Sequence, residues 1–67
     1  MLTKREQELV RLYAYEGLSG KDAAYRMGVT HMSFRTYVHR LARKLDLSSG
    51  NRWSFVVWLR EHPEALA

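Results

Sequence analysis

The chain of 67 residues contains no cysteine, only one proline and no long apolar run. The missing cysteines exclude disulfide bonds and thiolate metal sites, and their absence fits a reducing compartment. A membrane-spanning helix needs about 20 consecutive apolar residues, which this sequence does not offer. The N-terminus also lacks the features of a secretion signal. We therefore expect a cytoplasmic protein that makes no membrane contact.

Combinations of side chains typical of catalysis are missing as well. The histidines His31, His39 and His62 lack the four-residue spacing of a helical metal pair. Ser33 lies near His31 in the sequence, but no carboxylate completes a nucleophilic triad. We expect no enzyme activity, no cofactor and no metal site.

Capping signals divide the sequence into predicted helices. Thr3 followed by Glu6 is a capping-box pattern, and Gly17 predicts a left-handed stop. Ser19 repeats the start signal, and Gly28 closes the second helix. The sequence predicts one all-α domain over residues 1–67, with four helices at about residues 4–16, 19–27, 31–45 and 52–61.

The second and third predicted helices are joined by only about three residues, Gly28 to Thr30. Thr30 has the side chain of an N-cap for the longer third helix. A short helix, a glycine-containing turn and a longer basic helix form the arrangement of a helix-turn-helix domain.

The third predicted helix, residues 31–45, carries four positive charges, two histidines and no acidic residue. Its apolar residues Phe34, Val38, Leu41 and Leu45 recur with the period of one buried helix face. The opposite face is therefore cationic, which suits the phosphate-lined major groove of DNA. A net charge of +4 for the whole chain points the same way. The alternative is a merely solvated basic face.

The fourth predicted helix, residues 52–61, is apolar almost all round and is bounded by Pro63. In so small a domain one helix cannot bury every side, so we expect Trp58 to be partly exposed and to form an apolar patch with Val57 or Leu59 beside it. Helical spacing favours core positions for most aromatic residues, Tyr25 and Trp53 among them, although Trp53 also falls in the expected partner interface below.

The segments LTKREQELVRLYAYEGLSGKDAA and MGVTHMSFRTYVHRLARKLDL resemble the DNA-binding domain of LuxR/FixJ-type bacterial regulators, the GerE-like domain. The resemblance covers about residues 2–58. It implies a four-helix fold whose third helix enters the major groove and whose fourth helix usually forms a dimer contact. No receiver or ligand-binding domain precedes the segment, so we expect a stand-alone regulator from a bacterium or phage.

The resemblance also implies which residues contact DNA. Its base-reading positions fall on Arg35, Thr36 and His39, and His31 lies at the edge of that face. Arg43 and Lys44 could instead favour the negative end of their own helix. Expected phosphate contacts are Lys21, Ser19, Thr30, Ser33, Arg40, Arg43 and Lys44. The expected dimer or partner interface consists of Trp53, Val57, Trp58 and Glu61.

Several positions depart from the family pattern. The arginine usual after the loop is displaced, with Gly50 in its place and Arg52 two residues later, and Tyr37 stands where the family often has histidine. Phe34 replaces a smaller β-branched residue, which predicts a slightly shifted third helix. Asp46 stands where the family commonly has glycine, and aspartate tolerates a left-handed helix cap less well.

Two functions remain open from the sequence. The first is a sequence-specific transcriptional regulator that binds double-stranded DNA as a homodimer in the nucleoid. The alternative is a helix-turn-helix module that binds RNA polymerase or another transcription regulator. The opening LTKREQELV motivates it, because this segment is also similar to the promoter-reading region of sigma factors.

Overall fold

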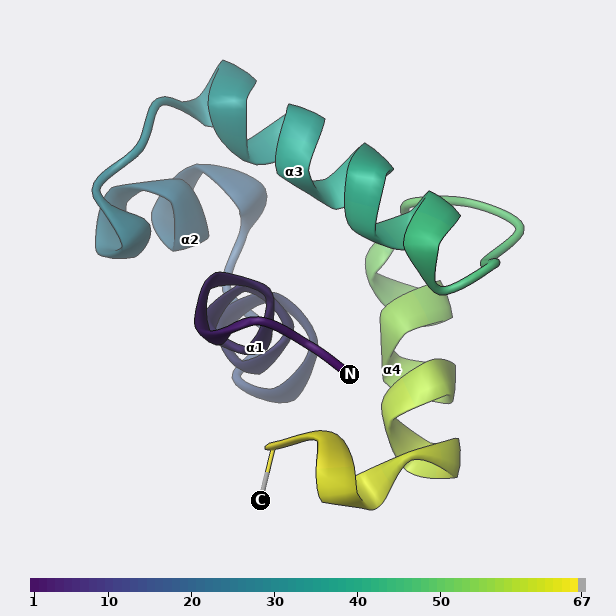
Figure 1. Cartoon of the computed structure of the whole chain (residues 1–67). Coiled ribbons are helices and arrows are strands. Elements are labelled where there is room, and N and C mark those ends of the chain that lie inside the picture. Colours follow the sequence, from purple (N-terminus) through teal and green to yellow (C-terminus); the bar gives the residue numbers. More distant parts are fainter. Residues whose placement is uncertain (67) are drawn as a thin grey trace.

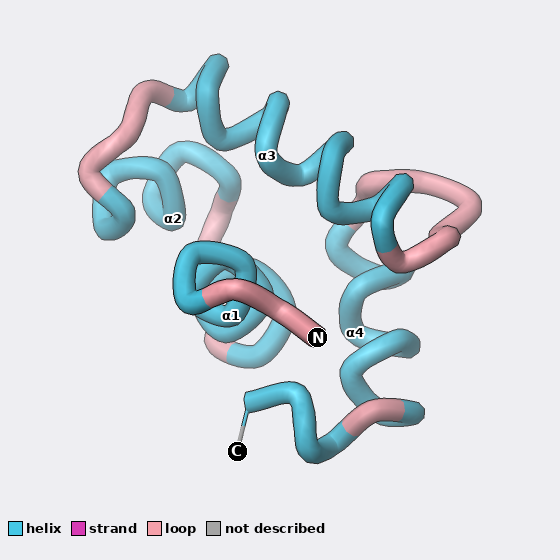
Figure 2. The backbone as a smooth tube through the Cα atoms, in the orientation of Figure 1, coloured by secondary structure: helices cyan, strands magenta, loops and turns pink. Residues whose placement is uncertain are grey.

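The structure, a computed structural model, describes residues 1–66 and contains four α-helices and no strand in that range (Figures 1 and 2). The predicted all-α fold is therefore confirmed. Its last two predicted helices end within one residue of the observed bounds. The elements are α1 (Lys4–Val10), a π-helical turn η1 (Arg11–Tyr15), α2 (Gly20–Met27), α3 (His31–Lys44), α4 (Arg52–Glu61) and a 3₁₀ turn η2 (Pro63–Leu66).

The helix starts follow from side-chain caps. The hydroxyl of Thr3 accepts the amide hydrogen of Glu6 at 3.1 Å, and the Glu6 carboxylate accepts that of Thr3 at 2.8 Å. The predicted capping box is thus present. The hydroxyls of Ser19 and Thr30 each accept an amide hydrogen three residues onward at 3.0 Å. Asn51 caps α4 in the same way, although the sequence pattern placed it only in a loop.

The helix ends depend on left-handed residues. Gly17 and Gly28 have φ values of 74° and 71°, as their positions predicted. Asp46 follows α3 with a φ of 58°, a conformation that L residues rarely adopt. Around it, Leu47 donates to the carbonyl of Ala42 at 2.8 Å, and Asp46 donates to that of Arg43 at 3.1 Å. These two bonds form a Schellman motif, so α3 ends where a glycine would end it.

The first predicted helix is not uniform. It is α-helical to Val10 and then widens into the π-helical turn η1, where Glu16 donates to the carbonyl of Arg11 at 2.8 Å. A π-helical turn accommodates one residue more than an α-helical turn. Because of this extra residue, the side chains after Val10 point in new directions around the helix.

The core lies around α1 and η1, with α2, α3 and α4 arranged about them (Figure 1). The predicted apolar face of α3 is buried at Phe34, Val38 and Leu41, whereas Leu45 is only half-buried. Small alanines at positions 23 and 24 let α2 pack closely against its neighbours. The buried hydrophobic residues in the described range are Leu2, Leu9, Val10, Leu12, Ala23, Ala24, Met27, Phe34, Val38, Leu41, Ala42 and Phe55.

Tyr25 and Trp53 do not belong to this core, and the expectation that they do is wrong. Their exposed fractions are 85% and 64%. Tyr25 lies on the side of α2 away from its buried alanines, and Phe55 occupies the position that α4 turns inward. A domain of this size does not bury every side of either helix.

We predict that Asp46→Gly raises the free energy of unfolding by up to about 1 kcal/mol, because glycine adopts positive φ without the steric cost of a Cβ atom. Urea unfolding followed by circular dichroism measures the change. The control is Ser48→Gly in the same loop, at a residue without positive φ, which is expected to give no stabilisation. A loss of stability in Asp46→Gly would contradict the prediction.

Candidate nucleic-acid interface

The outward surface of α3 can be located from its buried face. Successive residues turn by about 100°, so Thr36 lies diametrically opposite the line of Phe34, Val38 and Leu41. Met32 and Arg43 lie within about 40° of Thr36 on the same exposed side. The side of α3 that faces away from the core therefore carries Met32, Thr36 and Arg43.

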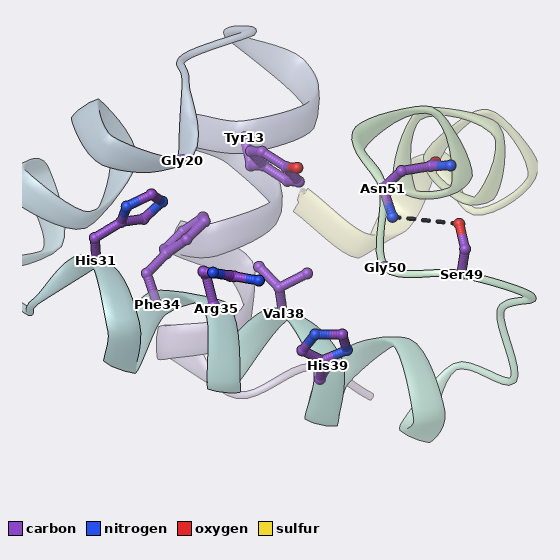
Figure 3. Close-up of a pocket in the computed structure, with 10 residues that line it drawn as sticks. All are labelled: Tyr13, Gly20, His31, Phe34, Arg35, Val38, His39, Ser49, Gly50 and Asn51. Atoms are coloured by element: carbon purple, nitrogen blue, oxygen red, sulfur yellow. Dashed lines mark hydrogen bonds between the residues drawn. The ribbon is translucent and has the colours of Figure 1, made fainter.

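A second row of α3, one residue in each turn, lies on the flank of the helix. His31, Arg35 and His39 form this row and line a groove of about 470 Å³ (Figure 3). Arg35 extends along the helix towards Val38 in this view, and His31 and His39 lie on either side of it. The other residues lining the groove are Tyr13, Gly20, Phe34, Val38, Ser49, Gly50 and Asn51.

Two glycines allow the chain to approach α3 closely along this groove. A Cβ atom on Gly20 would lie 3.2 Å from Nε2 of His31, and one on Gly50 would lie 3.1 Å from Cγ1 of Val38. Gly20 brings the N-terminus of α2 beside His31, and Gly50 brings the N-terminus of α4 near His39. Helix N-termini carry partial positive charge. Because none of the residues lining the groove is acidic, the whole groove favours an anion.

The expected phosphate contacts are spread around α3. Lys21, Arg40 and Arg43 are exposed. Arg40 lies on the flank opposite the groove of Arg35, in a hollow that it shares with residues of α1. Three of the expected phosphate contacts are hydroxyl residues at helix starts. Ser19 and Thr30 are the N-caps of α2 and α3. Ser33 is half-buried, and its backbone amide donates to the Thr30 hydroxyl.

Lys44 already has partners within the chain. Its ammonium group donates to the carboxylate of Glu6 at 2.8 Å and to the carbonyl of Met1 at 3.1 Å. A phosphate at Lys44 would have to compete with this ion pair. The expected phosphate contact of Lys44 stays a prediction, while the ion pair gives this side chain a role in joining α3 to the start of α1.

The ion pair also affects Glu6. Partial burial raises the pKa of Glu6, but the hydrogen bonds from Lys44 and from Thr3 lower it by more in total. The pKa therefore lies below its ordinary value of 4.5. The folded state is stabilised by ionised Glu6 above that value, and this contribution is lost as the pH falls through the lowered pKa.

Arg52 is a residue whose role the sequence did not predict. Its guanidinium group lies 4.9 Å from the centre of the Tyr13 ring and donates to the carbonyl of Leu18. These contacts anchor the start of α4 beside the groove of Arg35. The only sequence signal was an arginine displaced from its usual place in the resembled family, which gave no indication of the contact with Tyr13.

The expected interface residues of α4 do not share one face. Trp53, Val57 and Glu61 follow one another at four-residue intervals and are exposed. Trp58 is half-buried, as expected, but its ring stacks on that of His62 with centres 4.5 Å apart. It lies about 100° around the helix from Val57, whose exposed fraction is 37%, and the expected apolar patch of Trp58 with Val57 or Leu59 stays a prediction.

Within residues 1–66, no helix has the length and apolar character to cross a membrane. The same range contains no group of three histidine or acidic side chains that could hold a metal ion.

The short helix α2, the turn at Gly28 and the exposed basic helix α3 define a helix-turn-helix domain, a class of DNA-binding module. Residues 1–45 match the family described as Sigma-70, region 4. The chain belongs to this family, whose helix-turn-helix domains are non-catalytic DNA-binding modules. No match was found among curated proteins or among solved structures.

The family match covers α1, η1, α2 and α3 and ends at Leu45, before α4 begins. The wider resemblance to LuxR/FixJ-type regulators, including the role of α4, therefore stays a hypothesis.

We predict that Glu6→Gln lowers the free energy of unfolding by about 0.5 kcal/mol at neutral pH, because it removes the ion pair with Lys44 and keeps a capping-box side chain. Stability should also fall less between pH 7 and pH 3 than in the wild type, since one carboxylate with a lowered pKa is gone. Urea titrations at both pH values measure this. Glu64→Gln, at an exposed carboxylate without an ion pair in residues 1–66, is the control and should leave the acid loss unchanged.

Proposed function

We propose that the protein is a sequence-specific transcriptional regulator that binds double-stranded DNA, with α3 in the major groove. The exposed side of α3 supports this proposal most strongly, because it is cationic along its length and carries no carboxylate. A solvated helix face usually mixes charges of both signs. The carboxylate of Glu6, from the start of α1, pairs with Lys44 at the C-terminal end of α3.

The geometry suggests a division of roles among the expected base contacts. Thr36 lies on the side of α3 opposite the core and would face the floor of the major groove, where its methyl group suits a thymine methyl. Arg35 and His39 lie on one flank, and the guanidinium of Arg35 suits the O6 and N7 atoms of guanine. His31 lies nearest α2, at the edge of the surface.

Phosphate contacts would surround this surface. Lys21 on α2 and Arg40 and Arg43 on α3 present charges on different sides of the helix. The helix starts at Ser19 and Thr30 add backbone amides that suit an anion. Such contacts fix the position of α3 on the duplex, while base contacts select the sequence.

We further propose that α4 pairs two copies of the chain on DNA. The exposed row of Trp53, Val57 and Glu61 on α4 supports this, since Trp53 is a large apolar side chain without a partner in the core. A dimer of this kind would read two half-sites about one helical turn apart.

A second candidate is a module that binds RNA polymerase or another regulator. It is favoured by an apolar groove of about 370 Å³ between η1, α4 and η2, lined mainly by Tyr15, Val56, Leu59, Pro63 and Leu66. A random-site selection distinguishes the candidates. An enriched palindrome supports the regulator, and an unenriched pool together with stoichiometric binding of a polymerase subunit supports the module.

We predict that Arg35→Ala weakens binding to the selected site by about 1–3 kcal/mol and relaxes preference at one base pair. Competition between the selected duplex and single-base variants measures both effects. Arg26→Ala is the control, because it removes the same charge from an exposed residue at the end of α2. It should weaken specific and unrelated duplexes by similar factors. Full site preference in Arg35→Ala would contradict the assignment.

We predict that Trp53→Ala weakens self-association by about 2 kcal/mol or more, as for a central aromatic residue of an interface. Sedimentation of the chain alone and with a duplex carrying two half-sites measures it. Tyr25→Ala removes a still more exposed aromatic side chain from α2 and should leave association unchanged. Equal association of the wild type and Trp53→Ala would exclude this face of α4 as the dimer contact.

A further inference from the structure

Met32 is an apolar side chain on a surface that is otherwise polar or cationic. It is 79% exposed and belongs neither to the core nor to the half-buried residues packed against it. Its neighbours one turn onward on α3 are Arg35 and Thr36. Packing within the domain therefore does not explain a methionine at this position.

The position of Met32 is one that a helix-turn-helix domain uses for base contacts. It is the second residue of α3 and lies one turn before Thr36, on the side opposite the core. In this arrangement the N-terminal residues of the second helix contact base edges in the major groove. Met32 therefore lies where side chains of α3 would meet the base pairs.

Thr36 extends the apolar character of this position. Its hydroxyl donates to the carbonyl of Met32 at 3.3 Å, so the hydroxyl points back to the helix. The methyl group of Thr36 is then the part left for contact with a partner. Met32 and this methyl group form a small apolar surface about one helical turn long. Arg35 lies on one flank of it and Arg40 on the other.

The major groove offers one apolar group at its base edges, the C5-methyl of a pyrimidine, which thymine carries. A methionine side chain is unbranched and flexible, so it adapts to such a group without a fixed pocket. We infer that Met32 is a specificity-determining residue that contacts a pyrimidine C5-methyl group, with the methyl of Thr36 beside it. The inference rests on the proposed reading of duplex DNA by α3.

The test compares duplexes that differ by single methyl groups. Starting from the site enriched by random selection, each thymine is replaced in turn by deoxyuridine, and each cytosine by 5-methylcytosine. Dissociation constants are measured for the wild type, Met32→Ala and Met32→Leu. Tyr15→Ala is the control, because it removes an exposed aromatic side chain from the groove formed with α4. Circular dichroism checks that all variants are folded.

One buried methyl group corresponds to about a fourfold change in affinity. We expect the wild type, Met32→Leu and Tyr15→Ala to lose about fourfold when one particular thymine becomes deoxyuridine, and Met32→Ala to bind both duplexes equally. If the methyl that is read belongs to 5-methylcytosine, the wild type instead gains about fourfold on methylation, and Met32→Ala does not.

Two results would overturn the inference. In the first, a site is enriched, but each methyl change alters the affinity of Met32→Ala as much as that of the wild type. Met32 would then not be the residue that contacts the methyl group, and the proposed function would stand. A selection that enriches no site would overturn the proposed function and the inference together.

Discussion

The ring of Tyr13 joins the candidate recognition helix to α4. It packs edge-on against Phe34 of α3 with ring centres 5.5 Å apart, and against Phe55 of α4 at 6.2 Å. Arg52 covers its face and reaches the carbonyl of Leu18. Aromatic pairs of this geometry stabilise beyond the area that they bury. The groove beside Arg35 depends on these contacts, because Tyr13 lines it and Arg52 fixes the start of α4.

The same contacts explain how the domain accommodates Phe34, which is larger than the residue expected from the resembled family. A Cβ atom on Gly20 would lie 3.5 Å from the Phe34 ring, an ordinary van der Waals contact, so the ring reaches the start of α2 without a clash. Phe34 itself is buried. The larger side chain thus fills space between α2 and Tyr13, and the exposed side of α3 keeps the direction that the apolar pattern predicted.

The sequence predicted what local chemistry determines. The caps at Thr3, Ser19 and Thr30 depend on neighbours within one turn and are confirmed, as is the buried period of α3 except at its last residue, Leu45. The exposure of Trp53 depends on how helices distant in sequence pack. The same is true of the ion pair of Lys44, whose partner lies 38 residues away. Periodicity alone gives no direction for a helix that is apolar almost all round, which is why α4 was the least predictable element.

The widened turn at η1 has a consequence for the architecture of the domain. The apolar residues of a regular amphipathic α-helix lie on one face, so they pack against neighbours on one side only. The additional residue in the π-helical turn Arg11–Tyr15 shifts the apolar side chains that follow it around the helix axis. Leu9 and Val10 are buried before it, and Tyr13 meets both α3 and α4 within it. The continuous segment α1–η1 therefore packs against two helices that lie in different directions. A second helix to hold α4 in place is not needed.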